Sequence, residues 1–474
     1  MKTAQNFINN EFVSSANSAT IPVYSPVNGK LIAQVPSATV DEAIAAINAA
    51  ASAQKEWRKL TSVERATHLH RLADKLLEHK DAIGQALAEE SGKSLDDATN
   101  EAVYAADITR YHAEWARRIE GEVIPSDTPC ESLLLQREPI GVVSCLIPFN
   151  YPVYTLLRKI APALIAGNTV VVRPSNHTPC SAFAIAEAIK DTEFPAGVVN
   201  ILTMDHATSE VVCTHPKVGM ITLTGSVAAG RKVLEYSQVN IAKSSLELGG
   251  KTPAIIQPDA DLEKAAREIV GSRTTNCGQL CTAVERVYVH EAVHDKFVEL
   301  LRKNLAERQF GDRAKNPEFM GPLISDAARI KAHHMVQRAI EDGAKLEVGG
   351  YLPEGPGHFY PPTLLTHCRQ EMDIIQEEIF APILPVVKCR DVEQALEWAN
   401  DNQFGLASVV YTENYRTAMH VVNNIEAGEV YVNRTPSDPY QGYHAGWKRS
   451  GLGGDDGKHG MLEFTQTRLV VLNY

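Results

Sequence analysis

Residues 221–230 read Ile-Thr-Leu-Thr-Gly-Ser-Val-Ala-Ala-Gly, and this stretch decides the fold class. It is typical of a buried strand, a tight turn at Gly225 and a helix that begins near Ser226. A helix N-terminus presents unpaired N–H groups and the positive end of the helix dipole, and both suit a diphosphate. Because most strand-to-helix turns bind nothing, the stretch predicts α/β architecture and leaves nucleotide binding open.

The same alternation of strand and helix continues on both sides of this turn. Short β-rich apolar segments predict strands at 142–143, 169–172, 198–202, 220–223, 253–256, 284–289, 383–388, 408–411 and 429–433. Helical patterns separate them at 156–164, 181–190, 208–214 and 262–273. Strands that alternate with helices predict a doubly wound α/β fold with a largely parallel sheet.

The two ends of the chain have different patterns. The first 115 or so residues are expected to be helical after a short extended start. Thr39 with Glu42, and Thr61 with Glu64, have the spacing of capping boxes ahead of amphipathic runs. The last residues, 468–474, form a strongly β segment, which predicts pairing with another sheet or another subunit.

The bulk composition is that of a large globular protein. The chain has 474 residues, 44% of them hydrophobic and 22% charged, which predicts two or three domains. Its 46 basic and 58 acidic residues leave a net charge of −12, whereas a nucleic-acid partner would need clustered Lys and Arg. We therefore expect no nucleic-acid partner.

Targeting and redox signals point to the cytoplasm. The first residues lack the apolar core of a signal peptide. The longest apolar stretch, 160–172, is shorter than the ~20 residues of a membrane span, so no membrane association is expected. Eight cysteines spread over such a long chain do not resemble a disulfide framework, which favours a reducing compartment.

Two motif-like matches do not hold, and the sequence shows no metal-binding pattern. Gly451-x-Gly453-Gly454 resembles a dinucleotide fingerprint, but too little chain follows for the ~30-residue unit required, so a glycine-rich loop is expected at 451–457. Gly250-Lys251-Thr252 resembles the end of a phosphate-binding loop, but Ser245 stands where its first glycine is needed. His and Cys residues lack metal-ligand spacing, so no protein-bound metal is expected.

Two segments carry residues suited to carbonyl chemistry. Residues 276–281, Asn-Cys-Gly-Gln-Leu-Cys, offer the thiols of Cys277 and Cys281 in an expected loop, and a thiol attacks a carbonyl only as the thiolate. Glu247 lies between two leucines and beside two glycines, where desolvation would raise its pKa and suit it to general-base work. A buried structural cysteine and a surface glutamate are the alternatives that these residues leave open.

Together these segments resemble the aldehyde dehydrogenase superfamily over essentially the whole chain. Five motifs match in the family's order, and they are Pro148-Phe-Asn-Tyr-Pro152, Gly225-Ser226, Leu246-Glu-Leu-Gly-Gly-Lys251, Gly278-Gln-Leu-Cys281 and Glu377-Glu-Ile-Phe-Ala-Pro382. Phe149 stands where the family has Trp, and Ala381 where it has Gly. The fixed order makes the match specific.

The resemblance implies roles for individual residues. Cys281 would attack the aldehyde, Asn150 with the Cys281 backbone N–H would hold the oxyanion, and Glu247 would activate the water that hydrolyses the thioester. Lys159 would be a helix lysine near the cofactor side. The cofactor, NAD or NADP, would be bound by Ile147, Phe149, Arg173, Ser175, Asn176, Gly225, Ser226, Glu378 and Phe380.

The choice between the two cofactors depends on residues 173–176, Arg-Pro-Ser-Asn. NAD-preferring relatives carry Lys-Pro-Ser-Glu there, and the glutamate accepts hydrogen bonds from ribose hydroxyls and repels a 2′-phosphate. Asn176 removes that repulsion and Arg173 adds a cation that can pair with phosphate. The hypothesis is that NADP is accepted, with use of NAD beside it left open.

Within the superfamily, segments 113–121 and 441–460 resemble those of the bacterial lactaldehyde dehydrogenases. This closer resemblance implies a small polar aldehyde as substrate, with contacts from Arg158, Thr282, Asp438 and His444. A plain Arg–Asp ion pair and a histidine satisfied by backbone are the alternative. Thr282 replaces the asparagine expected after the nucleophile, and 435–440 differs strongly. Lactaldehyde, glycolaldehyde and a sugar-derived aldehyde such as an anhydrosugar therefore all stay open.

Other functions compete with this interpretation. A CoA-acylating dehydrogenase shares the fold and the cysteine but generally lacks the carboxylate base that Glu247 supplies. A catalytically inactive structural relative, or a regulatory nucleotide-binding module, would be expected to have lost Cys281, Glu247 or Asn150, and all three are present.

The resemblance also implies three parts of the chain and an assembly. The parts are a Rossmann-type cofactor-binding domain (1–115 and 138–249), an α/β catalytic domain (250–455) and a small β oligomerisation element (116–137 and 456–474). A homodimer or homotetramer is expected, without a choice between them. A redox role for Cys277, four residues before Cys281, is left open.

Overall fold

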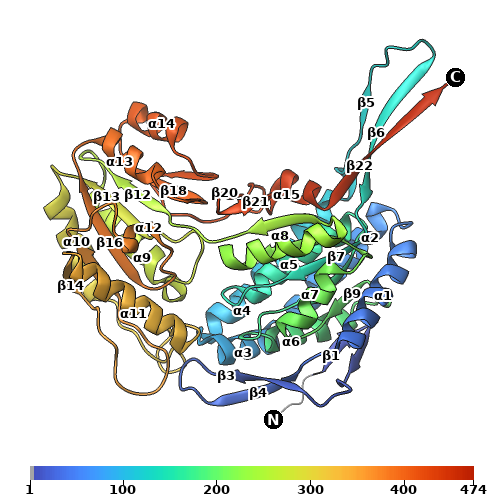
Figure 1. Ribbon diagram of the computed structural model, residues 1–474, viewed down its shortest axis with the longest axis horizontal. Coiled ribbons are helices and arrows are strands. Elements are labelled where there is room, and N and C mark those ends of the chain that lie inside the picture. The colour runs from blue at the N-terminus through green and yellow to red at the C-terminus, as the bar shows by residue number, and fades with distance from the viewer. Residues whose placement is uncertain (1–4) are drawn as a thin grey trace.

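Two open α/β sheets form the two lobes of the protein, and a three-stranded arm projects from one of them (Figure 1). The computed structural model describes residues 5–474. The expected α/β class is confirmed, because parallel strands alternate with helices along most of the chain. Every strand predicted between 142 and 433, and every helix predicted between 156 and 273, is present with small shifts at its ends.

The N-terminal lobe is built around a sheet with the strand order β2-β1-β9-β8-β7-β10-β11-β21. Its central strands are parallel and follow the order 3-2-1-4-5 of dinucleotide-binding folds, which reverses between β7 and β10. The strands are β1 (Asn6–Ile8), β2 (Glu11–Val13), β7 (Val142–Leu146), β8 (Thr169–Arg173), β9 (Val199–Ile201), β10 (Val218–Thr224), β11 (Lys243–Glu247) and β21 (Gly451–Leu452). Ligands bind such sheets outside the carboxyl ends of the strands at the reversal.

Helices and a short ribbon complete this lobe. The ribbon pairs β3 (Thr20–Tyr24) with β4 (Leu31–Pro36). The helices are α1 (Val40–Trp57), α2 (Ser62–Glu78), α3 (Lys80–Ser91), α4 (Leu95–Ala113), α5 (Pro152–Ile165), α6 (Cys180–Lys190), α7 (His206–Thr214) and α8 (Val227–Asn240). Both predicted capping boxes are confirmed at the starts of α1 and α2. Helix α5 is buried on almost every side, so the polar side chains that it carries must find partners inside the protein.

The C-terminal lobe has a second sheet, with the order β14-β15-β16-β13-β12-β18-β19. Its strands are parallel except β14, and they are β12 (Pro253–Ile256), β13 (Arg286–His290), β14 (Lys345–Val348), β15 (Thr363–Thr366), β16 (Ile383–Cys389), β18 (Ala407–Tyr411) and β19 (Glu429–Val432). Its helices are α9 (Leu262–Thr274), α10 (His294–Ala306), α11 (Asp326–Glu341), α12 (Asp373–Gln376), α13 (Val392–Asn400) and α14 (Tyr415–Asn424).

The arm consists of β5 (Glu122–Ile124), β6 (Glu131–Pro139) and the last strand, β22 (Thr465–Asn473). Strand β22 pairs antiparallel with β6 along its whole length, from Thr465 opposite Pro139 to Asn473 opposite Glu131. The C-terminal β segment therefore pairs with a sheet of its own chain. Figure 1 shows the arm extending away from both lobes, with the C-terminus near its tip.

Between the lobes the chain returns to the first sheet just before the arm. Strand β20 (Trp447–Lys448) pairs with β17 (Phe404–Gly405), and β21 then pairs antiparallel with β11, with Gly451 opposite Glu247. Helix α15 (Gly457–Glu463) follows. The prediction of a loop over 451–457 is therefore wrong at its start, because the glycines allow β21 to lie against β11.

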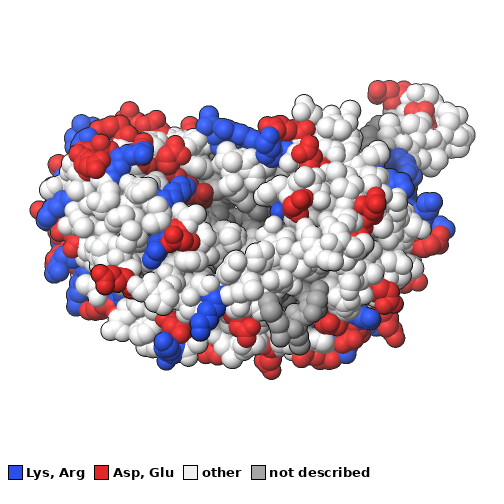
Figure 2. Space-filling view, turned by 60° about the horizontal axis from the view of Figure 1, so that its bottom comes forward, with Lys and Arg blue, Asp and Glu red and all other residues white. Residues whose placement is uncertain are grey.

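The surface and helices show two further features. None of the helices described in residues 5–474 is both long and apolar enough to cross a membrane. On the face shown in Figure 2, acidic and basic side chains are interspersed around a hollow between the lobes.

Candidate active site

Cys281 lies in the segment that leads from α9 to β13. The backbone turns sharply after α9, with left-handed φ values of 47° at Asn276 and 56° at Cys277. Non-glycine residues rarely adopt this conformation, and such strain is concentrated at functional sites. The buried Arg273 guanidinium stabilises the turn by donating to the carbonyls of Gly278 and Val284.

The two candidate thiols have different surroundings. Cys277 is fully buried in the core of the C-terminal lobe, and burial raises the pKa of its thiol. Cys281 is partly exposed and lines a cavity of about 570 Å³. An aldehyde can reach the sulfur of Cys281 through this cavity, whereas Cys277 has the properties of a structural thiol.

The cavity collects most of the catalytic and substrate residues proposed from sequence. Its wall includes Asn150, Arg158, Cys281, Thr282, Asp438 and His444. Tyrosines form much of the remaining wall, and they are Tyr104, Tyr151, Tyr154 and Tyr440. The cavity thus combines one thiol with several groups that can form hydrogen bonds to a hydroxylated ligand.

Asn150 is tied directly to the nucleophile segment. It lies between β7 and α5, and its Nδ2 donates to the carbonyl of Gln279 at 3.0 Å. Its own carbonyl accepts from Asn276 Nδ2 at 3.2 Å. The amide of Asn150 carries a second N–H, which suits it to hold an oxyanion formed next to Cys281.

Glu247 ends β11 and is 1% exposed, which excludes the surface alternative. Within residues 5–474 neither of its carboxyl oxygens has a hydrogen-bond partner. Burial raises the pKa of Glu247 to about 8, with a further increase from Asp455 and an opposing effect of His444. His444 Nε2 is 3.4 Å from the carboxyl. A carboxyl with a pKa near the operating pH can act as a general base.

A cluster of buried ion pairs lies beneath the cavity. Arg158 on α5 donates to both carboxyl oxygens of Asp456 and lies 3.6 Å from Asp438. Lys159 is fully buried and donates to Asp455 at 2.8 Å. Lys159 is a helix lysine as expected, and its place on the cofactor side stays a prediction. The Arg158–Asp438 ion pair weighed from sequence is present, but Asp456 is the nearer partner.

His444 is bound by a side chain as well as by backbone. Its Nδ1 lies 2.6 Å from Glu429 on β19 and 3.6 Å from Asp438. Glu429, Asp438 and His444 have potential ligand atoms within 4.8 Å of one another, and His444 Nδ1 contacts both carboxylates. Sequence reasoning missed Glu429, which belongs to no recognised motif. It also assigned no role to Asp455 and Asp456, although both lie in the recognised segment 441–460.

The turn after β10 has the features expected of a diphosphate site. Gly225 N donates to the Glu247 carbonyl at 2.9 Å, and the Ser226 side chain caps α8 by accepting from Ala229 N. This turn lies at the reversal of strand order, beside the end of β7. Just after β7, Ile147 N donates to the Arg173 carbonyl at 3.0 Å. The free N–H groups at the start of α8 fit a phosphate group.

The residues after β8 and the ring of Phe380 complete this side. Asn176 Oδ1 is buried and has no hydrogen-bond partner within the described chain, so it is free to accept from a ribose hydroxyl. Ser175 forms the turn next to it. The rings of Phe149 and Phe380 meet edge to face at 6.0 Å. An unpaired buried acceptor after β8 and a helix N-terminus after β10 together fit a dinucleotide.

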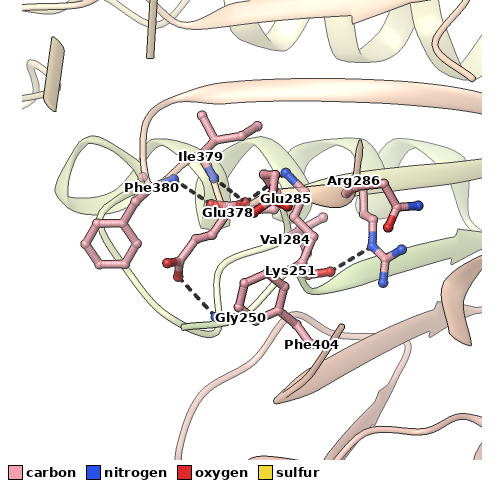
Figure 3. A network of polar contacts seen from close by, with 12 residues as sticks. Gly250, Lys251, Val284, Glu285, Arg286, Glu378, Ile379, Phe380 and Phe404 are labelled. Atoms are coloured by element: carbon pink, nitrogen blue, oxygen red, sulfur yellow. Dashed lines mark hydrogen bonds and ion pairs between the residues drawn. The ribbon is translucent and has the colours of Figure 1, made fainter. Parts of the chain in front are cut away.

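Glu378 and Phe380 are held in place by a buried carboxylate that the motifs did not reveal. Glu285 accepts from the backbone N–H groups of Ile379 at 3.0 Å and Phe380 at 2.8 Å (Figure 3). Lys251 and Arg273 pair with the same carboxylate at 3.0 and 3.1 Å. Glu285 thereby joins the cofactor-side segment to the Leu-Gly-Gly-Lys segment that follows Glu247.

Close backbone approach explains the paired glycines of that segment. A Cβ on Gly249 would lie 2.5 Å from the Glu378 carboxylate, and one on Gly250 would lie 2.3 Å from the Cys281 carbonyl. Gly250 N also donates to Glu378 at 3.0 Å (Figure 3). Burial raises the pKa of Glu378 to about 7, and Glu285 raises it further. The two glycines thus allow base, nucleophile and cofactor segments to meet.

The fold and this site define an NAD(P)-dependent aldehyde dehydrogenase. The chain belongs to the aldehyde dehydrogenase family, whose family model matches residues 12–470. The chain is 43% identical to lactaldehyde dehydrogenase of Escherichia coli (strain K12), with 98% of each chain covered. A crystal structure of that enzyme matches with a TM-score of 0.98 at 42% identity, covering 100% of this chain and 99% of that one.

Two further relatives are named for other aldehydes. One is 3,6-anhydro-alpha-L-galactose dehydrogenase of Streptomyces coelicolor, 38% identical over 99% of this chain and 96% of its own. The other is D-glyceraldehyde dehydrogenase (NADP(+)) of Thermoplasma acidophilum, 37% identical over 99% of this chain and 96% of its own. The closer likeness to lactaldehyde dehydrogenase expected from 113–121 and 441–460 is confirmed.

Proposed function

We propose that the protein oxidises a small hydroxylated aldehyde to its carboxylate by hydrolysis of a thioester on Cys281. The observation that carries this proposal is the cavity, in which the Cys281 thiol faces Arg158, Asp438 and His444. Arg and His donate hydrogen bonds and Asp accepts one, so these groups match hydroxyl substituents on an aldehyde.

Each catalytic side chain has one task in this mechanism. Cys281 adds to the carbonyl carbon and forms a thiohemiacetal, whose oxyanion is held by Asn150 and the Cys281 backbone N–H. When bound, the nicotinamide cofactor supplies the hydride acceptor that turns this adduct into a thioester. Glu247 then takes a proton from water, the water attacks the thioester, and the carboxylate leaves as the Cys281 thiol is restored.

Both the relatives and the lining of the cavity support a hydroxylated aldehyde as substrate. The relatives named above act on lactaldehyde, an anhydrosugar and glyceraldehyde, and each of these aldehydes carries oxygen substituents. The polar wall of the cavity favours lactaldehyde or glycolaldehyde. A cavity of about 570 Å³ lined by four tyrosines also has room for a sugar ring, which favours an anhydrosugar as the second candidate.

We propose that NADP is accepted through Asn176 and Arg173. Asn176 carries no charge to repel a 2′-phosphate, and its buried Oδ1 lacks a partner in the described chain. The Arg173 Nε donates at 3.4 Å to the Met204 carbonyl, which leaves the rest of its guanidinium to meet an anion. Burial lowers the pKa of Arg173, because desolvation disfavours its charged form. A bound phosphate would stabilise that charge.

The active-site residues argue against the two rival functions, a CoA-acylating dehydrogenase and an inactive relative. Transfer of the acyl group to CoA needs no carboxylate base for water, whereas the buried Glu247 has a raised pKa that suits hydrolysis. An inactive relative has no need to place Asn150 and Cys281 on one cavity. Both comparisons favour a hydrolytic enzyme.

We also propose that chains associate through the arm into a homodimer or homotetramer in the cytoplasm. The three-stranded sheet exposes apolar side chains to an unusual degree, including Val123 at 78%, Leu469 at 55% and Val471 at 50%. Such a patch marks an interaction surface. We further propose the division into a cofactor domain (1–115 and 138–249), a catalytic domain (250–455) and this oligomerisation element (116–137 and 456–474). Sedimentation equilibrium tests the assembly, and a monomer at micromolar concentration contradicts it.

The function is tested by supplying aldehydes without CoA. We expect reduced nicotinamide to form from L-lactaldehyde and glycolaldehyde with NADP or NAD, and Cys281→Ser to abolish it. Turnover of 3,6-anhydro-L-galactose alone would move the substrate to the second candidate. A strict requirement for CoA would contradict the hydrolytic mechanism.

A further inference from the structure

His444 is held in place by hydrogen bonds to its backbone and to its ring. It forms a two-way backbone bridge with Asp455, in which His444 N donates at 3.0 Å and Asp455 N donates back at 2.8 Å. Its ring is 3% exposed, with Nδ1 at 2.6 Å from Glu429. Tyr431 in turn donates to the other oxygen of Glu429 at 2.7 Å, so the carboxylate is itself oriented.

The other ring nitrogen faces the reacting groups. His444 Nε2 lies 3.4 Å from Glu247, and His444 lines the same cavity as Cys281. One imidazole thus lies between the nucleophile, the general base and an oriented carboxylate. A histidine that is oriented by a carboxylate and shares a cavity with a thiol can activate that cysteine.

The charges around the ring favour its cationic form. Burial and Arg158 act against the cation, but Asp438, Glu247 and Cys281 outweigh them and raise the pKa of His444 well above its usual value. The charged and titratable groups that face it are Arg158 on α5, Glu247 on β11, Glu429 on β19, Cys281, Asp438, Asp455 and Asp456. Burial raises the pKa of the Cys281 thiol, and His444 is the largest opposing influence.

We propose that His444 is a catalytic residue whose imidazolium stabilises the thiolate of Cys281. This inference rests on the proposed function, in which Cys281 is the nucleophile. The thiol proton passes to solvent through the cavity. His444 keeps both of its ring protons, with Nδ1 directed at Glu429 and Nε2 on the side of Glu247. The negative charge of Glu429 keeps the ring charged while the thiolate forms.

The inference is tested by alkylating Cys281 in the absence of aldehyde and cofactor. Iodoacetamide reacts with the thiolate, so its rate against pH reports the titration of Cys281, followed on the Cys281 peptide by mass spectrometry. In His444→Gln we expect alkylation at neutral pH to slow by about tenfold or more, since each pKa unit changes the thiolate fraction tenfold. The exposed Cys130 is an internal reference whose rate should not change.

Two further variants keep the test decisive. Glu429→Gln leaves His444 in place but removes its counter-charge, so we expect slower alkylation of Cys281 in the same direction, even if His444→Gln fails to fold. His459→Gln, at an exposed histidine on α15, is the matched control and should match the unmodified protein. An unchanged Cys281 profile in either active-site variant overturns the proposal.

Steady-state kinetics distinguish a role of His444 in activating Cys281 from a role in binding the substrate. If His444 activates Cys281, His444→Gln lowers kcat/KM for lactaldehyde and for propionaldehyde, which lacks the hydroxyl, by similar factors. A loss confined to lactaldehyde assigns His444 to substrate binding and overturns the proposal. Because the alkylation assay needs no turnover, it stands even if both aldehydes prove to be the wrong substrates.

Discussion

Replacing Glu247 with glutamine tests the active-site assignment at its most informative residue. The two side chains have nearly the same shape, but an amide cannot take a proton from water. Burial raises the pKa of Glu247 from 4.5 to about 8, a difference of about 5 kcal/mol against the ionised form. At pH 7 most Glu247 is therefore protonated, and its base form accumulates as the pH rises through about 8.

The expected kinetic result separates the two halves of the reaction. In Glu247→Gln the first turnover survives, because formation of the thioester uses Cys281 and Asn150. Hydrolysis slows by about 10²–10⁴-fold, the usual contribution of a general base. Rapid mixing with aldehyde and NADP should show a burst of reduced nicotinamide equal to the number of active sites, followed by a slow phase. A steady-state rate equal to that of the unmodified enzyme would refute the assignment.

The raised pKa of Glu247 predicts opposite pH trends for the steady-state rate and for the free energy of unfolding. The steady-state rate should rise through about pH 8 in the unmodified enzyme, and this rise should be absent in Glu247→Gln. Between pH 4.5 and about 8 the native protein keeps a proton that the unfolded chain has released. Its free energy of unfolding therefore falls across this window, by up to about 5 kcal/mol relative to the variant. Urea unfolding of both proteins at either end of the window measures the difference, and parallel curves would contradict the raised pKa.

Three other substitutions address the remaining parts of the site. Glu285→Gln leaves the buried cation of Lys251 without its counter-charge. We expect the free energy of unfolding in urea to fall by about 3–5 kcal/mol and the KM for the cofactor to rise. A variant as stable as the parent would show that Glu285 does not organise the segment that carries Glu378 and Phe380. Asn176→Glu should lower kcat/KM for NADP by roughly tenfold or more, which corresponds to about 1.4 kcal/mol of added repulsion, and should affect NAD little. Equal losses with both cofactors would argue against a 2′-phosphate at this position. Arg158→Gln should raise KM for lactaldehyde more than for propionaldehyde, and equal effects would reduce Arg158 to an ion-pair partner of Asp456.

The fold could be predicted from the sequence because its signals are local. A strand buried on both faces is a continuous apolar run, and the run at 169–172 became β8 for that reason. The capping boxes at Thr39 and Thr61 were visible because both partners lie within three residues of each other. Cys281 and Glu247 were found in the same way, since each lies in a short motif with flanking glycines.

The partners of these residues could not be predicted, because they come from distant parts of the chain. Glu285 is separated from Phe380 by 95 residues, and Arg158 from Asp456 by 298. No periodicity or motif marks such pairs, and their carboxylates resemble ordinary surface residues in the sequence. Burial, which the sequence does not report for an isolated Asp or Glu, is what turns them into parts of the site.

The glycines near the C-terminus show how one pattern can have a different physical cause. Their spacing resembles a phosphate-binding fingerprint, but the structure uses them for contact between backbones. A Cβ on Gly451 would lie 2.8 Å from the Leu246 carbonyl, and one on Gly446 would lie 2.3 Å from the carbonyl carbon of Ser450. These contacts let β21 pair with β11 beside Glu247. The same return of the chain carries His444 to the base and the nucleophile, so the glycines support the chemistry by permitting a close approach rather than by binding a ligand.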